Sequence, residues 1–304
     1  MGKRLISSKR KIIVTGLISS IAIFVALAFT FSFSTLPPSR TVLIHVPEGY
    51  TATEPTPVVF MLHGSGAGAE DAQNAFGFNA LSDREKFIAV YPQGIGDEEH
   101  GYDWNGGDCC GQASKDKIDD ISFLKQTYLN LKKNYNVDTS RVYIAGFSAG
   151  GIMAYRAGCE LPDIFASIGV QSGALAVESC SPSTPISVIH IHGSSDEVVP
   201  YDGGYSASER LVFKSVEESV NTFVSANRCI TESEDESILS GPRNSARIGV
   251  QISDWDPCAE GTGIRLVRIA EGNHAWAGNL NGDVTLGSTE MMWDWFKTHP
   301  KGKQ

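Results

Sequence analysis

The chain has 304 residues, which suits one large domain or two small ones, and 41% of them are hydrophobic, an ordinary fraction for a packed core. It carries 25 basic and 35 acidic residues, and five of the basic ones lie within the first eleven residues. The rest therefore holds 20 basic against 35 acidic residues, a formal charge of −15, without a basic stripe, which excludes a nucleic-acid partner.

The N-terminus is predicted to be an export signal or a membrane anchor. Residues 1–11 are strongly basic, and residues 12–36 are uncharged. An apolar run of roughly 20 residues can cross a bilayer, whereas a cleavable signal has an apolar core of about 7–15 residues. We therefore expect residues 1–36 to be a signal peptide or a signal-anchor transmembrane segment. A basic cluster before such a run places the following domain, residues 37–304, outside the cytoplasm, anchored to the membrane if the segment is not cleaved.

After the Pro37-Pro38 linker, short apolar runs recur along the chain. Each is continuous rather than alternating, as expected for strands that are buried on both faces of a parallel sheet. The predicted strands are Thr41–Val46, Pro55–Leu62, Phe87–Tyr91, Arg141–Phe147, Ser167–Ser172, Ile186–His192 and Ile264–Ile269.

Helical patterns separate these strands. The clearest covers Ile118–Tyr135, where apolar residues recur at steps of three and four; others follow Ser148, span Ala207–Ala226 and close the chain at Thr289–Lys297. Alternating strands and helices predict an α/β fold with a mostly parallel central sheet flanked by helices. Residues 94–117 and 232–263 are rich in Gly and Asp and weakly periodic, so we expect long loops there that build a binding cleft.

A nucleophile motif lies between a predicted strand and a predicted helix. Gly146-Phe147-Ser148-Ala149-Gly150 reads G-x-S-x-G, and a serine on such a tight turn is presented at the carboxyl edge of the sheet. The glycines allow close packing of strand and helix, and the helix N-terminus adds a positive dipole where negative charge develops.

A serine hydroxyl needs a base and an orienting acid, which in the α/β-hydrolase order follow it as Asp or Glu and then His. His274 lies in the glycine-flanked loop after the last predicted strand, whereas His190 and His192 lie within a buried strand and His299 in a polar tail. Asp196 directly follows the strand that ends at His192 and is either the acid or a turn-capping residue. We predict Ser148, Asp196 and His274 as a catalytic triad.

The segment His63-Gly64-Ser65-Gly66 follows the Pro55–Leu62 strand and is either an oxyanion loop or a plain glycine turn. As an oxyanion loop it would supply the backbone N–H of Ser65, beside that of Ala149.

Six cysteines, at 109, 110, 159, 180, 229 and 258, can all pair in an oxidising compartment, but 15 connectivities are possible. Their spacing makes a zinc site improbable, and the proposed chemistry needs no cofactor or metal.

In order along the chain, the motifs HGSGAG, YPQG, WNGGDCCG, DDISFL, VDTSRVYIAGFSAGGIMAY, HIHGSSDEVVPY and GNHAWAG resemble the family of feruloyl esterases, acetyl xylan esterases and extracellular polyhydroxybutyrate depolymerases. The resemblance covers residues 40–296. It implies an α/β-hydrolase fold and the same triad.

The resemblance also implies further roles. It places Trp104, Cys109 and Cys110 near the cleft, so that Trp104 either contacts substrate or stays buried in a disulfide-pinned loop. Trp276 either packs against substrate, the role we favour, or holds the histidine loop. Asp119 and Asp120 fit N-terminal helix caps better than catalytic acids.

For the remaining cysteines, the resemblance implies a Cys229–Cys258 disulfide, and Cys159 and Cys180 flank one predicted strand and can pair. The chain departs from its relatives in two places, a missing proline after Trp276 and a longer, more acidic segment at 232–263.

These observations predict an extracytoplasmic serine esterase that uses an acyl-enzyme to cleave feruloyl, acetyl or hydroxyalkanoate esters, possibly on polymers. Two alternatives are a prolyl-oligopeptidase-like serine peptidase and an inactive, membrane-tethered binding protein. The acyl group, the fate of the N-terminal segment and the oligomeric state are not fixed by the sequence.

Overall fold

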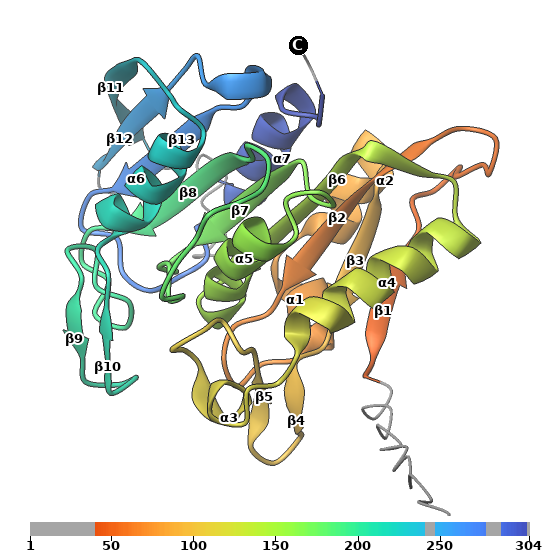
Figure 1. Ribbon diagram of the computed structural model, residues 1–304, viewed down its shortest axis with the longest axis horizontal. Helices are drawn as coiled ribbons and strands as arrows, with labels where there is room; N and C mark the ends of the chain where they lie inside the picture. Colours follow the sequence, from red (N-terminus) through yellow and green to blue (C-terminus); the bar gives the residue numbers. More distant parts are fainter. Residues whose placement is uncertain (1–39, 241–246, 278–286, 303–304) are drawn as a thin grey trace, which may run out of the picture. The chain divides into compact units, whose positions relative to one another are not determined.

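A twisted sheet forms the centre of the protein from Arg40 onward (Figure 1). The computed structural model describes residues 40–240, 247–277 and 287–302, and within these ranges the main sheet has nine strands. In spatial order they are β1 (Val42–His45), β3 (Ile88–Pro92), β2 (Thr56–Leu62), β6 (Val137–Phe147), β7 (Ser167–Gln171), β8 (Ser187–Gly193), β13 (Ile264–Ile269), β12 (Arg247–Trp255) and β11 (Glu232–Ser240).

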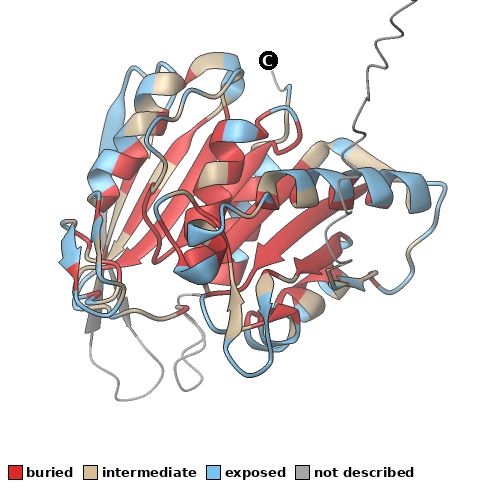
Figure 2. Ribbon diagram, turned by 60° about the horizontal axis from the view of Figure 1, so that its bottom comes forward, coloured by how far each residue is buried: buried red, intermediate tan, exposed pale blue. Residues whose placement is uncertain are grey.

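The middle of the sheet is parallel and its two edges are antiparallel. The strands from β3 to β13 run parallel, whereas β1 pairs antiparallel with β3, and β12 and β11 continue antiparallel beyond β13. Strands β2, β3, β7 and β8 are buried along their whole length, as Figure 2 shows. Their largely apolar sequences are therefore explained by helices on both faces of the sheet.

Helices cover the two faces in separate groups (Figure 1). Side chains of α4, α5 and α6 belong to one apolar cluster, and those of α1, α2 and α7 to the other. The helices are α1 (Ala69–Ala75), α2 (Phe78–Glu85), α3 (Gly111–Lys115), α4 (Asp120–Asn134), α5 (Ala149–Glu160), α6 (Val216–Ala226) and α7 (Ser288–Thr298). The predicted mostly parallel α/β sheet and the main helices are confirmed.

Two predicted elements differ from the structure. The helix expected over Ala207–Ala226 begins only at Val216, because Ser215 caps its N-terminus in a capping box with Glu218. Before it, β9 (Gly204–Ser206) and β10 (Leu211–Phe213) form a small hairpin.

The second long loop, expected at 232–263, is mostly the hairpin of β11 and β12 followed by a short 3-10 turn at Ala259–Gly261. Its backbone hydrogen bonds continue the sheet beyond β13, so tertiary pairing decides its structure. The first long loop contains the ribbon of β4 (Ile95–Asp97) and β5 (Gly101–Asp103) besides α3.

The predicted signal or anchor at residues 1–36 lies outside the described residues. Within the part of the chain that is described, no helix is both long and apolar enough to cross a membrane.

Candidate active site

Ser148 occupies a strained turn between β6 and α5. Its φ is 54° and its ψ is −123°, a backbone conformation that side-chain-bearing residues rarely adopt, and its N–H donates to the carbonyl of Gln171 at 2.9 Å. A Cβ on Gly146 would overlap the Gly150 carbonyl oxygen, and one on Gly150 would overlap the carbonyl of Leu62. The G-x-S-x-G glycines are therefore required by the close approach of β6, α5 and β2.

The Ser148 side chain is directed to a histidine rather than to its own helix. Ser148 is the N-cap residue of α5, yet its hydroxyl caps no backbone N–H. Instead, its Oγ lies 3.0 Å from Nε2 of His274, and Nδ1 of His274 lies 2.8 Å from Oδ2 of Asp196. The structure thus brings together the three side chains predicted as a triad, although 126 and 78 residues separate the two pairs.

The carboxylate of Asp196 is buried and holds its charge. Its Oδ1 accepts the N–H groups of Val198 and Val199 at 2.9 and 2.8 Å, and its Oδ2 faces His274 and His192. Burial by itself would raise the pKa of this carboxyl, but the hydrogen bonds from His192, His274 and the Val199 N–H outweigh it and hold the pKa well below its ordinary value. The carboxylate therefore stays ionised beside His274.

Backbone hydrogen bonds join the loops that carry the acid and the histidine. The N–H of Ser195 donates to the carbonyl of Gly272 at 2.8 Å, and the Glu271 N–H donates to the Ser194 hydroxyl at 2.9 Å. Gln171, buried at the end of β7, donates its side-chain amide to the Ala275 carbonyl at 2.7 Å. Sequence reasoning missed Gln171, although a polar residue at the carboxyl end of a buried strand could have indicated it.

The predicted oxyanion loop runs against the nucleophile. A Cβ built on Gly64 would lie 3.4 Å from Cβ of Ser148 and 3.3 Å from the Phe147 ring, so the loop backbone is in contact with the serine. The Ser65 hydroxyl donates to the Asp103 carboxylate, and Ala149 is the buried first residue of α5. Of the two residues predicted to supply backbone N–H groups, Ala149 directly follows Ser148, and Ser65 directly follows Gly64, the loop residue that contacts Ser148.

His63 is a buried, neutral anchor of this loop. Its Nε2 accepts the Gly94 N–H at 2.9 Å, so Nδ1 carries the proton and donates to the Gly64 carbonyl at 2.8 Å. Burial lowers the pKa of His63 to about 4, and the hydrogen bond to Gly64 opposes this only in part.

The family model for the PHB depolymerase esterases matches residues 41–210, more than half of the chain, and includes Ser148, Asp196 and the His63 loop. The chain belongs to this esterase family. Its predicted membership among the feruloyl esterases, acetyl xylan esterases and PHB depolymerases is therefore confirmed.

Relatives of this esterase carry related names. Over 266 residues it is 26% identical to feruloyl esterase B of Piromyces equi, covering 85% of this chain and 45% of the relative. Over 162 residues it is 33% identical to poly(3-hydroxyalkanoate) depolymerase C of Paucimonas lemoignei, covering 51% of this chain and 36% of the relative. The esterase thus spans less than half the length of either relative.

A solved structure agrees on the α/β-hydrolase fold. The acetyl xylan esterase from Aspergillus awamori superposes with a TM-score of 0.58 at 15% identity, over 84% of this chain and 93% of that chain.

Both tryptophans expected at the substrate are buried in this esterase. The indole of Trp104 is fully buried and donates to the His63 carbonyl at 3.0 Å, with the buried Arg40–Asp120 ion pair nearby. Trp104 therefore takes the second of its two expected places, buried in the disulfide-pinned loop, where it supports the His63 loop; its substrate-binding role stays a prediction.

Trp276 is only 5% exposed and takes the alternative role, that of holding the histidine loop. Its Nε1 donates to the Thr289 hydroxyl at 3.2 Å, and its ring packs against Phe76 at 4.6 Å between centroids. The substrate contact that we favoured from sequence is not what the structure places there.

The six cysteines, all within the described ranges, form three disulfides. Cys229–Cys258 and Cys159–Cys180 pair as expected, and the remaining bond joins the neighbours Cys109 and Cys110. Asp119 caps the N-terminus of α4 by accepting the Ser122 N–H at 2.9 Å, as expected. Asp120, also expected to be a cap, is not one: it is the buried first residue of α4, and its carboxylate accepts Arg40 and the Asn105 N–H.

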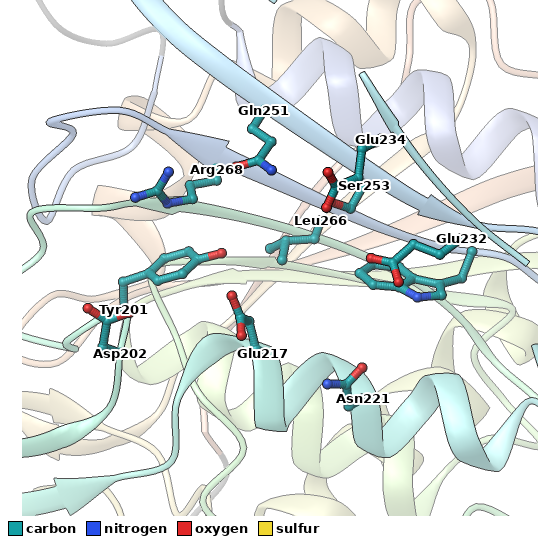
Figure 3. Close-up of a pocket in the computed structure, with 11 residues that line it drawn as sticks. Tyr201, Asp202, Glu217, Asn221, Glu232, Glu234, Gln251, Ser253, Leu266 and Arg268 are labelled. Carbon is teal, nitrogen blue, oxygen red and sulfur yellow. The ribbon is translucent and has the colours of Figure 1, made fainter. Parts of the chain in front are cut away.

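A separate hollow lies between α6 and the strands β11 to β13 (Figure 3). It has a volume of about 410 Å³, and its lining includes the carboxylates of Asp202, Glu217, Glu232 and Glu234. None of the three triad residues lines it, so we assign it no part in the chemistry.

Proposed function

We propose that this esterase is an extracytoplasmic serine carboxylic-ester hydrolase that works through an acyl-enzyme. The single observation that carries the proposal is the continuous hydrogen-bonded series from the Ser148 hydroxyl through His274 to the ionised Asp196. A solvated serine is a poor nucleophile, and this arrangement supplies both the base and the orienting acid that it needs.

The proposed reaction has two steps. Ser148 Oγ attacks the ester carbonyl carbon while Nε2 of His274 takes the hydroxyl proton, and the tetrahedral oxyanion accepts the backbone N–H groups of Ser65 and Ala149. Collapse breaks the bond to the alcohol oxygen, which receives the proton from His274. Water, deprotonated by His274, then attacks the acyl carbon, the bond from that carbon to Ser148 Oγ breaks, and His274 returns the proton to Oγ as the carboxylic acid leaves.

The orientation of His274 supports this sequence of events. Its Nδ1 faces the Asp196 carboxylate, which can only accept, so the neutral ring carries its proton on Nδ1 and offers a free lone pair on Nε2 to Ser148. When Nε2 is protonated, the buried carboxylate stabilises the imidazolium.

The substrate class is proposed from the relatives. Their names include feruloyl esterase, acetylxylan esterase and poly(3-hydroxyalkanoate) depolymerase, which share ester hydrolysis and differ in the acyl group. We propose a feruloyl, acetyl or hydroxyalkanoate ester, on a polymer or on its fragments. Three disulfides among the described residues support an oxidising, extracytoplasmic location, with residues 1–36 as the export signal or anchor.

The test is a parallel assay of the protein on methyl ferulate, acetylated xylan and short hydroxybutyrate oligomers, with a proline p-nitroanilide as the peptidase control. We expect turnover of at least one ester and none of the anilide. Hydrolysis of the anilide alone would favour a prolyl-oligopeptidase-like peptidase, and inactivity on every substrate would favour a binding protein.

A further inference from the structure

A second series of hydrogen bonds continues from Asp196 into the core, away from Ser148. His192 and His190 on β8 and Tyr155 on α5 are all completely buried. The Tyr155 hydroxyl lies 2.5 Å from Nδ1 of His190, and Nε2 of His190 lies 2.8 Å from Nδ1 of His192. Nε2 of His192 lies 2.9 Å from the Val199 carbonyl and 3.3 Å from Oδ2 of Asp196.

The positions of the protons follow from the end of this series. A carbonyl and a carboxylate can only accept, so Nε2 of His192 carries a proton and its Nδ1 accepts. His190 must then donate from Nε2, which leaves its Nδ1 to accept the Tyr155 hydroxyl. The donors along the series therefore all face toward Val199 and Asp196, and each ring carries a proton on Nε2.

Burial keeps His190 and Tyr155 neutral. It lowers the pKa of His190 well below its ordinary value and raises that of Tyr155 well above its own. In the described part of the chain, the titratable and charged groups beside this series include His274, which shares Oδ2 of Asp196, and Tyr201, whose ring packs edge-on against His192 at 5.8 Å between centroids. Arg268 covers the Tyr201 ring, and Glu217 and Asp202 lie near it.

We propose that His192, oriented by His190 and Tyr155, is a positioning residue that fixes the carboxylate of Asp196 toward His274. The inference rests on the proposed function. Tyr155 lies two helical turns after Ser148 on α5, so the series also ties the nucleophile helix to the strand that carries the acid. Aliphatic side chains could fill the same space in the core but could not form these hydrogen bonds, so packing alone does not account for the polar residues.

The first experiment compares His192→Met, which removes the donor, with His192→Gln, which keeps an amide donor near the position of Nε2. Activity on the best ester is expressed per active site titrated with a fluorophosphonate. We expect His192→Met to lower kcat about 10- to 100-fold with little change in KM, and His192→Gln to recover most of it. We also expect the acid limb of kcat/KM to move to higher pH in His192→Met. Without the N–H of His192 beside it, the Asp196 carboxylate should stabilise the protonated form of His274 more strongly.

Two tyrosine-to-phenylalanine substitutions distinguish an effect on the position of Asp196 from an effect on core packing. Tyr155→Phe removes only the hydroxyl at the far end of the series, and its ring still stacks on Phe223 at 5.4 Å. Tyr143→Phe is the control, since its hydroxyl is equally buried but has no hydrogen-bond partner among the described residues. We expect Tyr155→Phe to lower kcat about threefold or more with a shifted acid limb, and Tyr143→Phe to change neither.

Nitrogen-15 NMR of the wild-type protein provides a readout that needs no variant to fold. At about pH 8, His190 and His192 should both appear as rings protonated on Nε2 and not on Nδ1. A proton on Nδ1 of His192 would overturn the inference, as would His192→Met with an unchanged kcat and acid limb.

Wild type and Ser148→Ala are assayed alongside to keep the two claims apart. An inactive wild type, or an active Ser148→Ala, defeats the proposed function and this inference with it. If turnover depends on Ser148 but His192→Met and Tyr155→Phe leave kcat unchanged, the positioning inference is wrong and the proposed function still stands.

Discussion

At the scale of single residues, the candidate site depends on side chains held in one orientation by buried partners. Ser148 has a positive φ, Asp196 accepts hydrogen bonds on both oxygens, and His63 is held between Gly64 and Gly94. A site whose groups are already oriented loses little entropy when the reaction begins. Changes of one atom should therefore have large effects on turnover and small effects on the fold.

The Ser148→Ala variant should lower kcat by about four to six orders of magnitude, because residual hydrolysis would come only from binding and the oxyanion groups. The far-ultraviolet circular dichroism spectrum should not change. Steady-state kinetics on the best ester would measure the loss, and a variant that kept even a tenth of the activity would remove Ser148 from the mechanism.

The Trp104→Phe variant should lower kcat about tenfold, because it removes the hydrogen bond to the His63 carbonyl that supports the oxyanion loop. Trp293→Phe is the matched control, since it removes an indole hydrogen bond to Glu85 on the far side of the fold. Both variants should melt at a lower temperature. If kcat per titrated site fell equally in both, the support role of Trp104 would be refuted.

At the scale of elements, sequence patterns predict the parallel part of the sheet well and its antiparallel edge poorly. Strands such as β2 and β3 are almost entirely apolar because both faces are buried, which makes them recognisable in the sequence. Strand β11 begins Glu232-Ser233-Glu234-Asp235 and has no apolar pattern. It is a strand because β12 offers backbone partners, and no local propensity reveals that.

In the candidate site, too, some residues are predictable from the sequence and others are not. Ser148, Asp196 and His274 are predictable because each follows a recognisable strand, whereas the roles of Trp104 and Trp276 depend on burial. The series from Tyr155 to His192 was not predicted, because the pairing of α5 with β8 side chains across the core leaves no trace in local sequence.

Removing the Cys229–Cys258 disulfide with paired serine substitutions should lower the free energy of unfolding by about 3.6 kcal/mol, from the loop entropy of a separation of 29 residues. The bond connects the end of α6 to the turn after β12. Urea denaturation would measure the change. An unchanged unfolding midpoint would show that this edge of the sheet is stable without the cross-link.

At the scale of the whole molecule, buried neutral histidines should make the protein sensitive to mild acid. Burial lowers the pKa of His63 to about 4 and also lowers the pKa values of His190 and His299. Below the ordinary histidine pKa of about 6.5, the unfolded chain binds protons that the folded protein does not. Stability contributed by these residues is therefore present above about pH 6.5 and is lost as the pH falls.

For His63 alone this loss reaches roughly 3 kcal/mol near pH 4. Thermal or urea unfolding between about pH 7 and about pH 5 should show stability falling before most carboxylates titrate. Asp196 does not contribute in this window, because its pKa lies well below the ordinary value and its effect appears only at lower pH. Stability that stayed level to about pH 5 would contradict the neutral, buried state of these rings.

The central claim is that Ser148 becomes an acylated nucleophile with the help of His274 and Asp196. The most direct measurement is fluorophosphonate labelling of the wild-type protein followed by mass spectrometry of its peptides. We predict one adduct, on Ser148, and strongly reduced labelling in a His274→Ala variant, which keeps the serine but lacks its base. An adduct on another residue, or labelling at an undiminished rate without His274, would contradict it.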